Sequence, residues 1–206
     1  FLYYARAVDG MMLPALSALA SEQSKPTKNT MKKCTQHFDY PATHNEDVLT
    51  HHPTHNLLDI HIEASYLNSR NSRSRVRGHH FLSSNDAIPA NNGAVLNISQ
   101  VIKAVMSSAA ESELGGLFIN AKHAIPQRNL LKEMGHPQPP TPIQTDNSTA
   151  YGIVNSSIRQ RRSRAIDMRF YWVRDRVRQN HFLVYWKLGR ENLGDYFTKH
   201  HPPAHH

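Results

Sequence analysis

A strict alternation of apolar and polar residues between Leu58 and Ser65 constrains the fold of this chain more than any other stretch. The apolar residues come at every second position: Leu58, Ile60, Ile62 and Ala64. A period of two predicts a β-strand that packs one face into a core and turns polar groups to the other. Glu63 falls among the polar residues, so its carboxylate is expected to point away from the packed face.

Two further strands are expected after this one. A basic turn from Ser69 to Arg75 leads to a second strand near Gly78 to Ser83. Asn91-Asn92-Gly93 is typical of a tight hairpin turn, and residues 94 to 106 are expected to form the third strand. Consecutive strands joined by tight turns predict an antiparallel meander.

The stretch from Thr141 to Ala150 predicts a short strand that stops at Asp146 and passes directly into a helix. Asn147 and the two residues after it offer side-chain caps for that helix. A carboxylate at the carboxyl end of a strand is placed where α/β folds tend to carry their chemistry. Asp, Asn and Ser are also ordinary helix-capping residues. The pattern alone therefore leaves open whether Asp146 is a functional carboxylate or part of a helix cap.

Three more helices and a last strand complete the pattern. Ser107-Ser108 is expected to cap a helix with an apolar stripe at Leu114, Leu117 and Phe118, and periodicity leaves open whether Glu111 or Glu113 faces the sheet. An arginine-rich run, residues 159 to 164, precedes another amphipathic helix. The strand from His181 to Trp186 is expected to turn at residue 189 into a short helix that contains Asp195.

Composition narrows the class of protein and its partners. The 206 residues carry a net charge of +8 with neutral histidines, which favours a polyanionic partner such as nucleic acid. The single cysteine, Cys34, excludes an internal disulfide and fits a reducing compartment. No apolar run approaches the ~18 residues that a membrane span needs, so no membrane partner is expected. Because the chain starts at Phe1 inside a helical pattern, we expect it to be a piece of a longer polypeptide.

Three regions are predicted along the chain. Residues 1 to 52 are expected to form a helical segment of three short amphipathic helices, interrupted at Lys25-Pro26-Thr27. Residues 53 to 199 are expected to form the main α/β domain, and the histidine-rich run from His51 to His55 is expected to be a linker. Residues 200 to 206 are expected to be a disordered tail.

Five short motifs stand in a characteristic order on these elements. They are Glu63-Ala64-Ser65-Tyr66, the segment 107–114 with sequence SSAAESEL, Thr145-Asp146-Asn147-Ser148, Ile166-Asp167-Met168-Arg169, and the segment 192–199 with sequence NLGDYFTK. In this order they resemble the ribonuclease H domain at the carboxyl end of the Pol polyprotein of copia-type LTR retrotransposons. The resemblance covers residues 56 to 199, and residues 1 to 52 resemble the connection that follows the reverse transcriptase in these elements.

The resemblance implies a ribonuclease H-like α/β fold, in which a mixed five-stranded sheet of three antiparallel strands and two more is flanked by helices. It also implies a metal-dependent enzyme that hydrolyses the RNA strand of RNA–DNA hybrids. The family pattern of Glu followed by an apolar residue selects Glu113 over Glu111. Four residues are implied to be catalytic and to ligate two Mg²⁺ ions, for which Mn²⁺ can substitute. They are Glu63, Glu113, Asp146 and Asp195.

The partners implied are the hybrid itself and an upstream reverse transcriptase domain of the same polyprotein. Phosphates would be contacted by a set of basic and polar residues and bound with steep salt dependence. These are Arg73, Arg75, Asn147, Arg161, Arg162, Arg164 and Lys199. An intracellular location is expected, either cytoplasmic in a virus-like particle or nuclear.

Glu63 departs from the family pattern, which has Asp on the first strand. One additional methylene displaces the carboxylate, and Mg²⁺ demands tight octahedral geometry, so weakened cleavage is expected. Asp59 lies on the same face but ~13 Å away along the strand, too far to replace it. The alternative is a catalytically inactive, nucleic-acid-binding remnant of a Pol polyprotein. A third hypothesis, an integrase-like nuclease of the same superfamily, would place the last acidic residue in a different helix.

Overall fold

The computed structural model describes the chain except residues 47, 87–90, 157–167, 190–191 and 194–206. Its centre is one five-stranded mixed sheet in the order β3-β2-β1-β4-β5. The first three strands are antiparallel, and β4 and β5 run parallel to β1. The predicted sheet is therefore confirmed. The strands are β1 (Leu57–Ser69), β2 (Arg73–Ser83), β3 (Ala94–Val101), β4 (Thr141–Thr145) and β5 (Phe182–Trp186).

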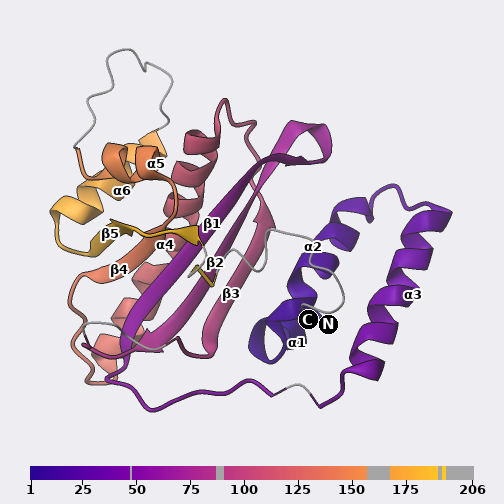
Figure 1. The fold of residues 1–206 in the computed structure, drawn as a ribbon, viewed down its shortest axis with the longest axis horizontal. Coiled ribbons are helices and arrows are strands. Elements are labelled where there is room, and N and C mark those ends of the chain that lie inside the picture. The colour runs from indigo at the N-terminus through magenta and orange to yellow at the C-terminus, as the bar shows by residue number, and fades with distance from the viewer. Residues whose placement is uncertain (47, 87–90, 157–167, 190–191, 194–206) are drawn as a thin grey trace.

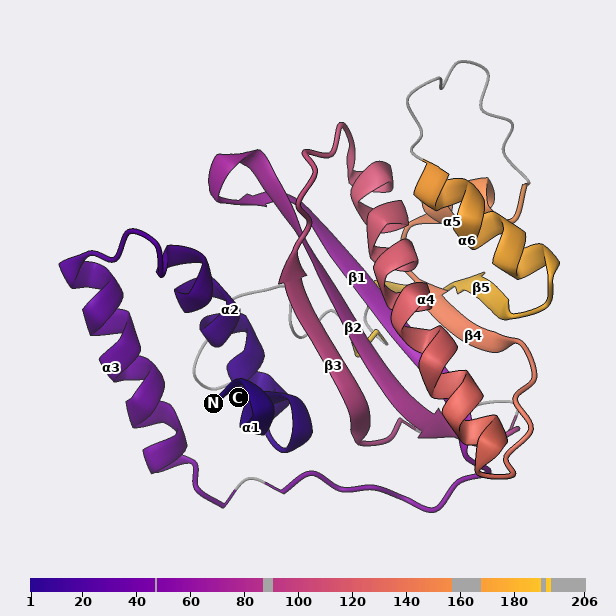
Figure 2. The same ribbon diagram turned by 180° about the vertical axis from the view of Figure 1, so that it is seen from behind.

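Three helices cover one face of the sheet, as the two opposite views in Figures 1 and 2 show. The long helix α4 (Ala109–Glu133) crosses β1 and β2, while α5 (Ser148–Val154) and α6 (Met168–Arg178) lie beside it near β4 and β5. Ser108 caps α4 by accepting a hydrogen bond from the Glu111 amide at 3.1 Å. The predicted cap is thus confirmed.

The core lies between this helical layer and the sheet. Leu58, Ile60 and Ile62 of β1 are buried there, as the period of two predicted. They pack with Leu117 and Ala121 of α4 in one apolar cluster. The intervening β1 residues, Glu63 among them, therefore face the opposite side of the sheet.

The helical segment at the start of the chain lies beside the β3 edge (Figure 1). It contains α1 (Leu2–Ala7), a short 3-10 helix η1 (Gly10–Met12), α2 (Leu13–Glu22) and α3 (Lys28–Thr43). Thr27 and Thr30 form a capping box at the start of α3, directly after the predicted break. Ala5, Met12 and Leu13 form a separate small apolar cluster, so this segment has little core of its own.

The predicted tight hairpin between the second and third strands is wrong. β2 ends at Ser83 and β3 begins at Ala94, so a longer connection joins them. The Asn92 amide donates to the carbonyls of His52 and Leu82, and the Gly93 amide donates to the Thr50 carbonyl. These residues tie the linker to the sheet instead of closing a two-residue turn.

Other strand boundaries also differ from the expectation. β3 stops at Val101 and not at residue 106, while β2 begins at Arg73, after the 3-10 turn η2 (Arg70–Ser72). The arginine-rich run 159–164, the helix expected around Asp195 and the tail 200–206 lie outside the described residues. None of the helices in the described part of the chain is both long enough and apolar enough to span a bilayer.

Candidate active site

Three acidic side chains reach one region from three different elements. Glu63 stands on β1, Glu113 lies in the second turn of α4, and Asp146 directly follows β4. β1 and β4 are neighbours in the sheet, and α4 packs across β1. Sequence positions far apart are therefore brought to the same end of the sheet.

Glu113 is the most buried of these acids, at 2% exposure. Its Oε1 accepts a hydrogen bond of 2.8 Å from the Thr145 hydroxyl. Burial raises the pKa of Glu113 well above its usual range, and the negative charges of Glu63 and then Asp146 raise it further. The charges of Glu63 and Asp146 thus act on the Glu113 carboxyl group, and we refer to these three residues as the acidic cluster.

Asp146 is positioned by the end of the sheet. The Trp186 indole donates to the Asp146 backbone carbonyl at 2.8 Å. A Cβ atom on Gly189 would lie 3.1 Å from Asp146 Oδ2, so the chain after β5 packs closely on this carboxylate. Asn147, predicted as a nucleic-acid contact, caps α5 by accepting from the Ala150 amide at 2.9 Å.

Asp195 lies outside the described residues, and its role stays a prediction. The segment just before it is anchored to β1. The Asn192 side chain donates to the Ile62 carbonyl at 2.6 Å, and the Leu193 amide donates to His61 Nδ1 at 3.1 Å. Both contacts are made to the two residues that precede Glu63, so Asn192 and Leu193 lie beside the strand that carries this carboxylate.

The described residues do not by themselves assemble a complete metal site. Within the part of the chain that the structure describes, no group of three or more His, Cys, Asp or Glu side chains is arranged to hold a metal ion. The donor chemistry of Glu63, Glu113 and Asp146 suits Mg²⁺, which prefers hard oxygen ligands. Among the described residues their arrangement does not complete its octahedral shell.

The predicted phosphate contacts divide into different environments. Arg73 is half-buried at the start of β2, whereas Arg75 is 8% exposed and donates to the Ser17 hydroxyl of α2 at 2.6 Å. Arg75 therefore lies beneath the helical segment and not on the open basic surface that the sequence predicted. Four of the predicted residues lie outside the described residues: Arg161, Arg162, Arg164 and Lys199.

Sequence reasoning assigned no role to Thr145, which the structure places against Glu113. Its position directly before Asp146 was the available signal.

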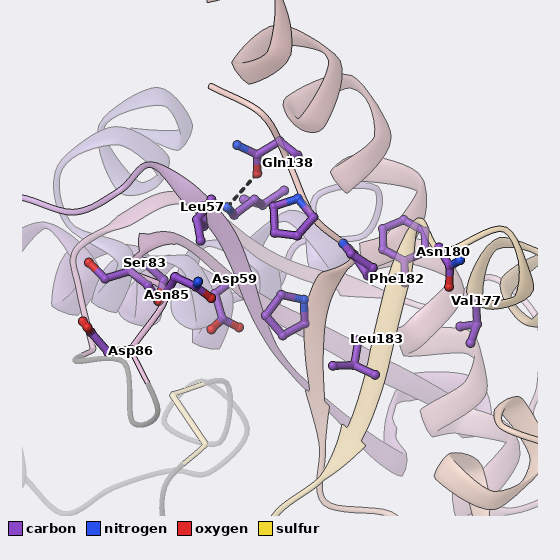
Figure 3. A pocket seen from close by; sticks show the side chains of 15 residues that line it. Leu57, Asp59, Ser83, Asn85, Asp86, Gln138, Val177, Asn180, Phe182 and Leu183 are labelled. Atoms are coloured by element: carbon purple, nitrogen blue, oxygen red, sulfur yellow. Dashed lines mark hydrogen bonds between the residues drawn. The ribbon is translucent and has the colours of Figure 1, made fainter. Parts of the chain in front are cut away.

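The structure also contains a cavity of about 440 Å³ at the other end of the sheet, which no sequence pattern indicated (Figure 3). Asp59 and Asp86 lie on its β1 and β2 side, and Phe182 and Leu183 lie on its β5 side. Burial raises the pKa of Asp59 to about 6. This cavity is separate from the acidic cluster.

Comparison with known proteins gives a match in structure but not in sequence. No family model matches the chain, and no curated protein matches it. LC11-RNase H1, isolated from compost by a metagenomic approach, superposes with a TM-score of 0.50 at 10% identity, over 69% of this chain and 92% of that one.

Two further structures superpose less closely. RNase H1 from the halophilic archaeon Halobacterium salinarum gives a TM-score of 0.43 at 12% identity, over 67% of this chain and 90% of that one. Prototype foamy virus protease-reverse transcriptase gives 0.39 at 11% identity, over 74% of this chain and 21% of that one. Together with the strand order, the similarity to LC11-RNase H1 defines this chain as a ribonuclease H-like α/β fold.

Proposed function

We propose that this chain is the ribonuclease H domain of a copia-type retroelement, which hydrolyses the RNA strand of RNA–DNA hybrids with divalent cations. The observation that carries the proposal is the acidic cluster of Glu63, Glu113 and Asp146 at one end of a ribonuclease H-like sheet. A buried carboxyl group whose pKa is raised by neighbouring carboxylates, as that of Glu113 is, is characteristic of functional sites.

The residues have distinct proposed roles. Glu113 and Asp146, together with Glu63 and Asp195, would hold two Mg²⁺ ions, which supply charge neutralisation at the scissile phosphate. Thr145 holds the Glu113 carboxylate by its hydrogen bond. Trp186 holds the backbone of Asp146 by a hydrogen bond to its carbonyl, and the absence of a side chain on Gly189 leaves room for the Asp146 carboxylate. On this proposal the chain follows a reverse transcriptase in its polyprotein and acts in cytoplasmic particles or in the nucleus.

Glu63 is expected to weaken the activity. Its carboxylate is one methylene further from β1 than an aspartate would be, and Mg²⁺ tolerates little displacement. We expect slow cleavage of a labelled hybrid with Mg²⁺ or Mn²⁺, and about a tenfold or larger increase for Glu63→Asp, which corresponds to about 1.4 kcal/mol of barrier. Glu113→Gln and Asp146→Asn should remove the activity. Cleavage that persists in both of these variants would refute the proposal.

A second candidate function is hybrid binding without catalysis. Glu63 on the first strand, where the family pattern has Asp, and the net charge of +8 favour it. It predicts that the hybrid binds equally well with EDTA and with Mg²⁺, that binding survives Asp146→Asn, and that Glu63→Asp restores no cleavage.

A further inference from the structure

A basic pocket lies between the carboxyl-terminal halves of α4 and α6. It has a volume of about 210 Å³. Glu113 and Arg128 are 15 residues apart on α4, which corresponds to roughly 22 Å at about 1.5 Å per residue. The pocket is therefore far from the acidic cluster and does not depend on the proposed nuclease function. Its polar and aromatic lining comprises Arg128, Asn129, Lys132, Trp172, Arg176 and His181.

Both guanidinium groups of the described lining, those of Arg128 and Arg176, are held in place by contacts within the protein. Arg128 is 4% exposed and donates to the carbonyls of Gln138 and Pro139 and to the Thr141 hydroxyl. Arg176 lies 5.2 Å from the centre of the Trp172 ring and donates to the Gln179 side chain at 3.0 Å. Trp172 is in turn packed edge-on against Phe118. Preorganised donors lose little conformational entropy when a ligand binds.

Polar atoms remain unsatisfied at this site. His181 Nδ1 and Arg176 Nε are buried without a hydrogen-bond partner among the described residues. No carboxylate belongs to the described lining. Asp175 is the acidic group that acts on His181, and its Oδ2 accepts a hydrogen bond from Gln179. Burial and the charges of Arg176, Arg128 and Lys132 lower the pKa of His181.

We propose that this pocket binds a phosphate group. Clustered cations, a histidine and an amide donor are the groups that recognise phosphate, and Arg binds it through several directed donors. A water occupies ~30 Å³ in the liquid, so a cavity of about 210 Å³ holds a phosphate with part of its organic substituent. The Trp172 ring forms an apolar wall for that substituent. The phosphate belongs either to a small phosphorylated molecule or to a nucleic-acid end.

The test measures phosphate binding to the full chain by calorimetry at constant ionic strength, with chloride as the reference anion. We expect saturable binding of inorganic phosphate and a shift of the His181 ring resonances, assigned with His181→Gln. Lys132→Gln and Arg176→Gln should each weaken binding at least fivefold. Lys122→Gln, an exposed lysine of the same helix outside the pocket, is the matched control and should leave binding unchanged.

Short RNAs with a 5′-phosphate or a 5′-hydroxyl distinguish the two sources. Tighter binding of the 5′-phosphorylated RNA that is lost in Lys132→Gln supports the pocket and identifies a nucleic-acid end as its ligand. Binding of inorganic phosphate without this preference supports a small phosphorylated molecule. Absence of saturable phosphate binding, or an equal loss in Lys122→Gln, overturns the proposal. Thermal unfolding in chloride confirms that the variants are folded.

Discussion

At the scale of single residues, Glu113 shows how the acidic cluster affects stability. Its carboxyl group is buried and lies near two further carboxyl groups, so its charged form is disfavoured unless a cation is bound. The Thr145 hydroxyl and the Ala64 amide each donate a hydrogen bond, and together they offset only part of this cost. The residue is therefore poorly suited to a purely structural role.

Glu113→Gln should stabilise the protein when divalent cations are absent. The amide cannot ionise and keeps an oxygen acceptor for Thr145, so the unfolded state no longer gains the free energy of ionisation at neutral pH, and we expect a stability gain on the order of 1–3 kcal/mol. Thermal unfolding in EDTA and in Mg²⁺ measures it. Mg²⁺ should stabilise the wild type and much less the variant. Glu111→Gln, on the same helix, should keep the full Mg²⁺ response; an equal response in Glu113→Gln would contradict the argument.

Asp59, which lines the cavity of Figure 3, should make the stability of the protein depend on pH. Burial raises its pKa from 3.8 to about 6, so the native state binds more protons than the unfolded state between these values. The contribution of Asp59 to stability is then complete below pH ~4 and falls as the pH rises through 6. Each factor of ten in proton affinity is worth about 1.4 kcal/mol, which gives about 3 kcal/mol for Asp59.

Asp59→Asn should accordingly be more stable than the wild type by about 2–3 kcal/mol above pH 6, with the difference vanishing below pH ~4. The Asn oxygen can still accept from the Ile60 amide, as Asp59 Oδ1 does at 2.7 Å. Urea unfolding across this pH range measures the difference. Asp86→Asn, exposed on the same cavity, is the control and should change stability by less than about 0.5 kcal/mol. A pH-independent difference for Asp59→Asn would refute the assignment.

At the scale of elements, the packing of α4 on β2 depends on a close approach at Gly78. A Cβ atom there would lie 1.7 Å from Asn120 Oδ1. The Asn120 side chain is completely buried, donates to the carbonyls of Arg77 and Gly116, and makes a hydrogen bond with His80. Glycine at this position lets one amide side chain connect the helix to the strand.

Gly78→Ala should therefore destabilise the protein by about 2–4 kcal/mol, because it displaces Asn120 from several buried hydrogen bonds. Asn120→Ala should also destabilise it. In the double variant the new methyl group occupies space that Asn120 has left, so the combined loss should fall short of the sum by more than about 1 kcal/mol. Denaturant unfolding of the four proteins measures this coupling. Additive losses would show that the two residues do not interact.

The same elements show what local sequence patterns can predict. The burial of Leu58, Ile60 and Ile62 follows from a period of two, and the start of α4 follows from the Ser108 cap. The connection at Asn92 could not be predicted in this way, because its conformation depends on hydrogen bonds to the distant residues His52 and Leu82. Local propensity favours a tight turn, and tertiary contacts override it.

The candidate site likewise contains residues that local sequence patterns predict and residues that they do not. Asp146 was predictable as a carboxylate at a strand end, whereas choosing Glu113 over Glu111 required the family pattern, since periodicity left both open. The structure places Glu113 inside and leaves Glu111 near the surface, where it accepts from the Ser107 amide. The burial of Arg75 depends on α2, which packs from more than fifty residues away, and no local pattern contains that information.

At the scale of the whole molecule, the net charge of +8 should dominate the affinity for a hybrid. When binding releases counterions from phosphates, the logarithm of the binding constant falls linearly with the logarithm of the salt concentration. The slope is about −0.9 for each phosphate contacted. If the domain contacts four or more phosphates, the slope is steeper than about −3. A slope shallower than about −1 would show that charge contributes little to binding.

Arg73 and Arg75 allow this charge effect to be assigned to a surface. Both stand on β2, two residues apart, but Arg73 is half-buried while Arg75 is 8% exposed and donates to Ser17 of α2. A direct phosphate contact contributes about one unit to the salt slope. We therefore expect Arg73→Gln to reduce the slope by about 1 and Arg75→Gln to leave it unchanged, in fluorescence anisotropy titrations of a labelled hybrid over a range of salt concentrations. If Arg75→Gln reduced the slope as much as Arg73→Gln, the helical segment would have to move away from Arg75 when the hybrid binds. The hydrogen bond between Arg75 and Ser17 would then be absent from the bound protein.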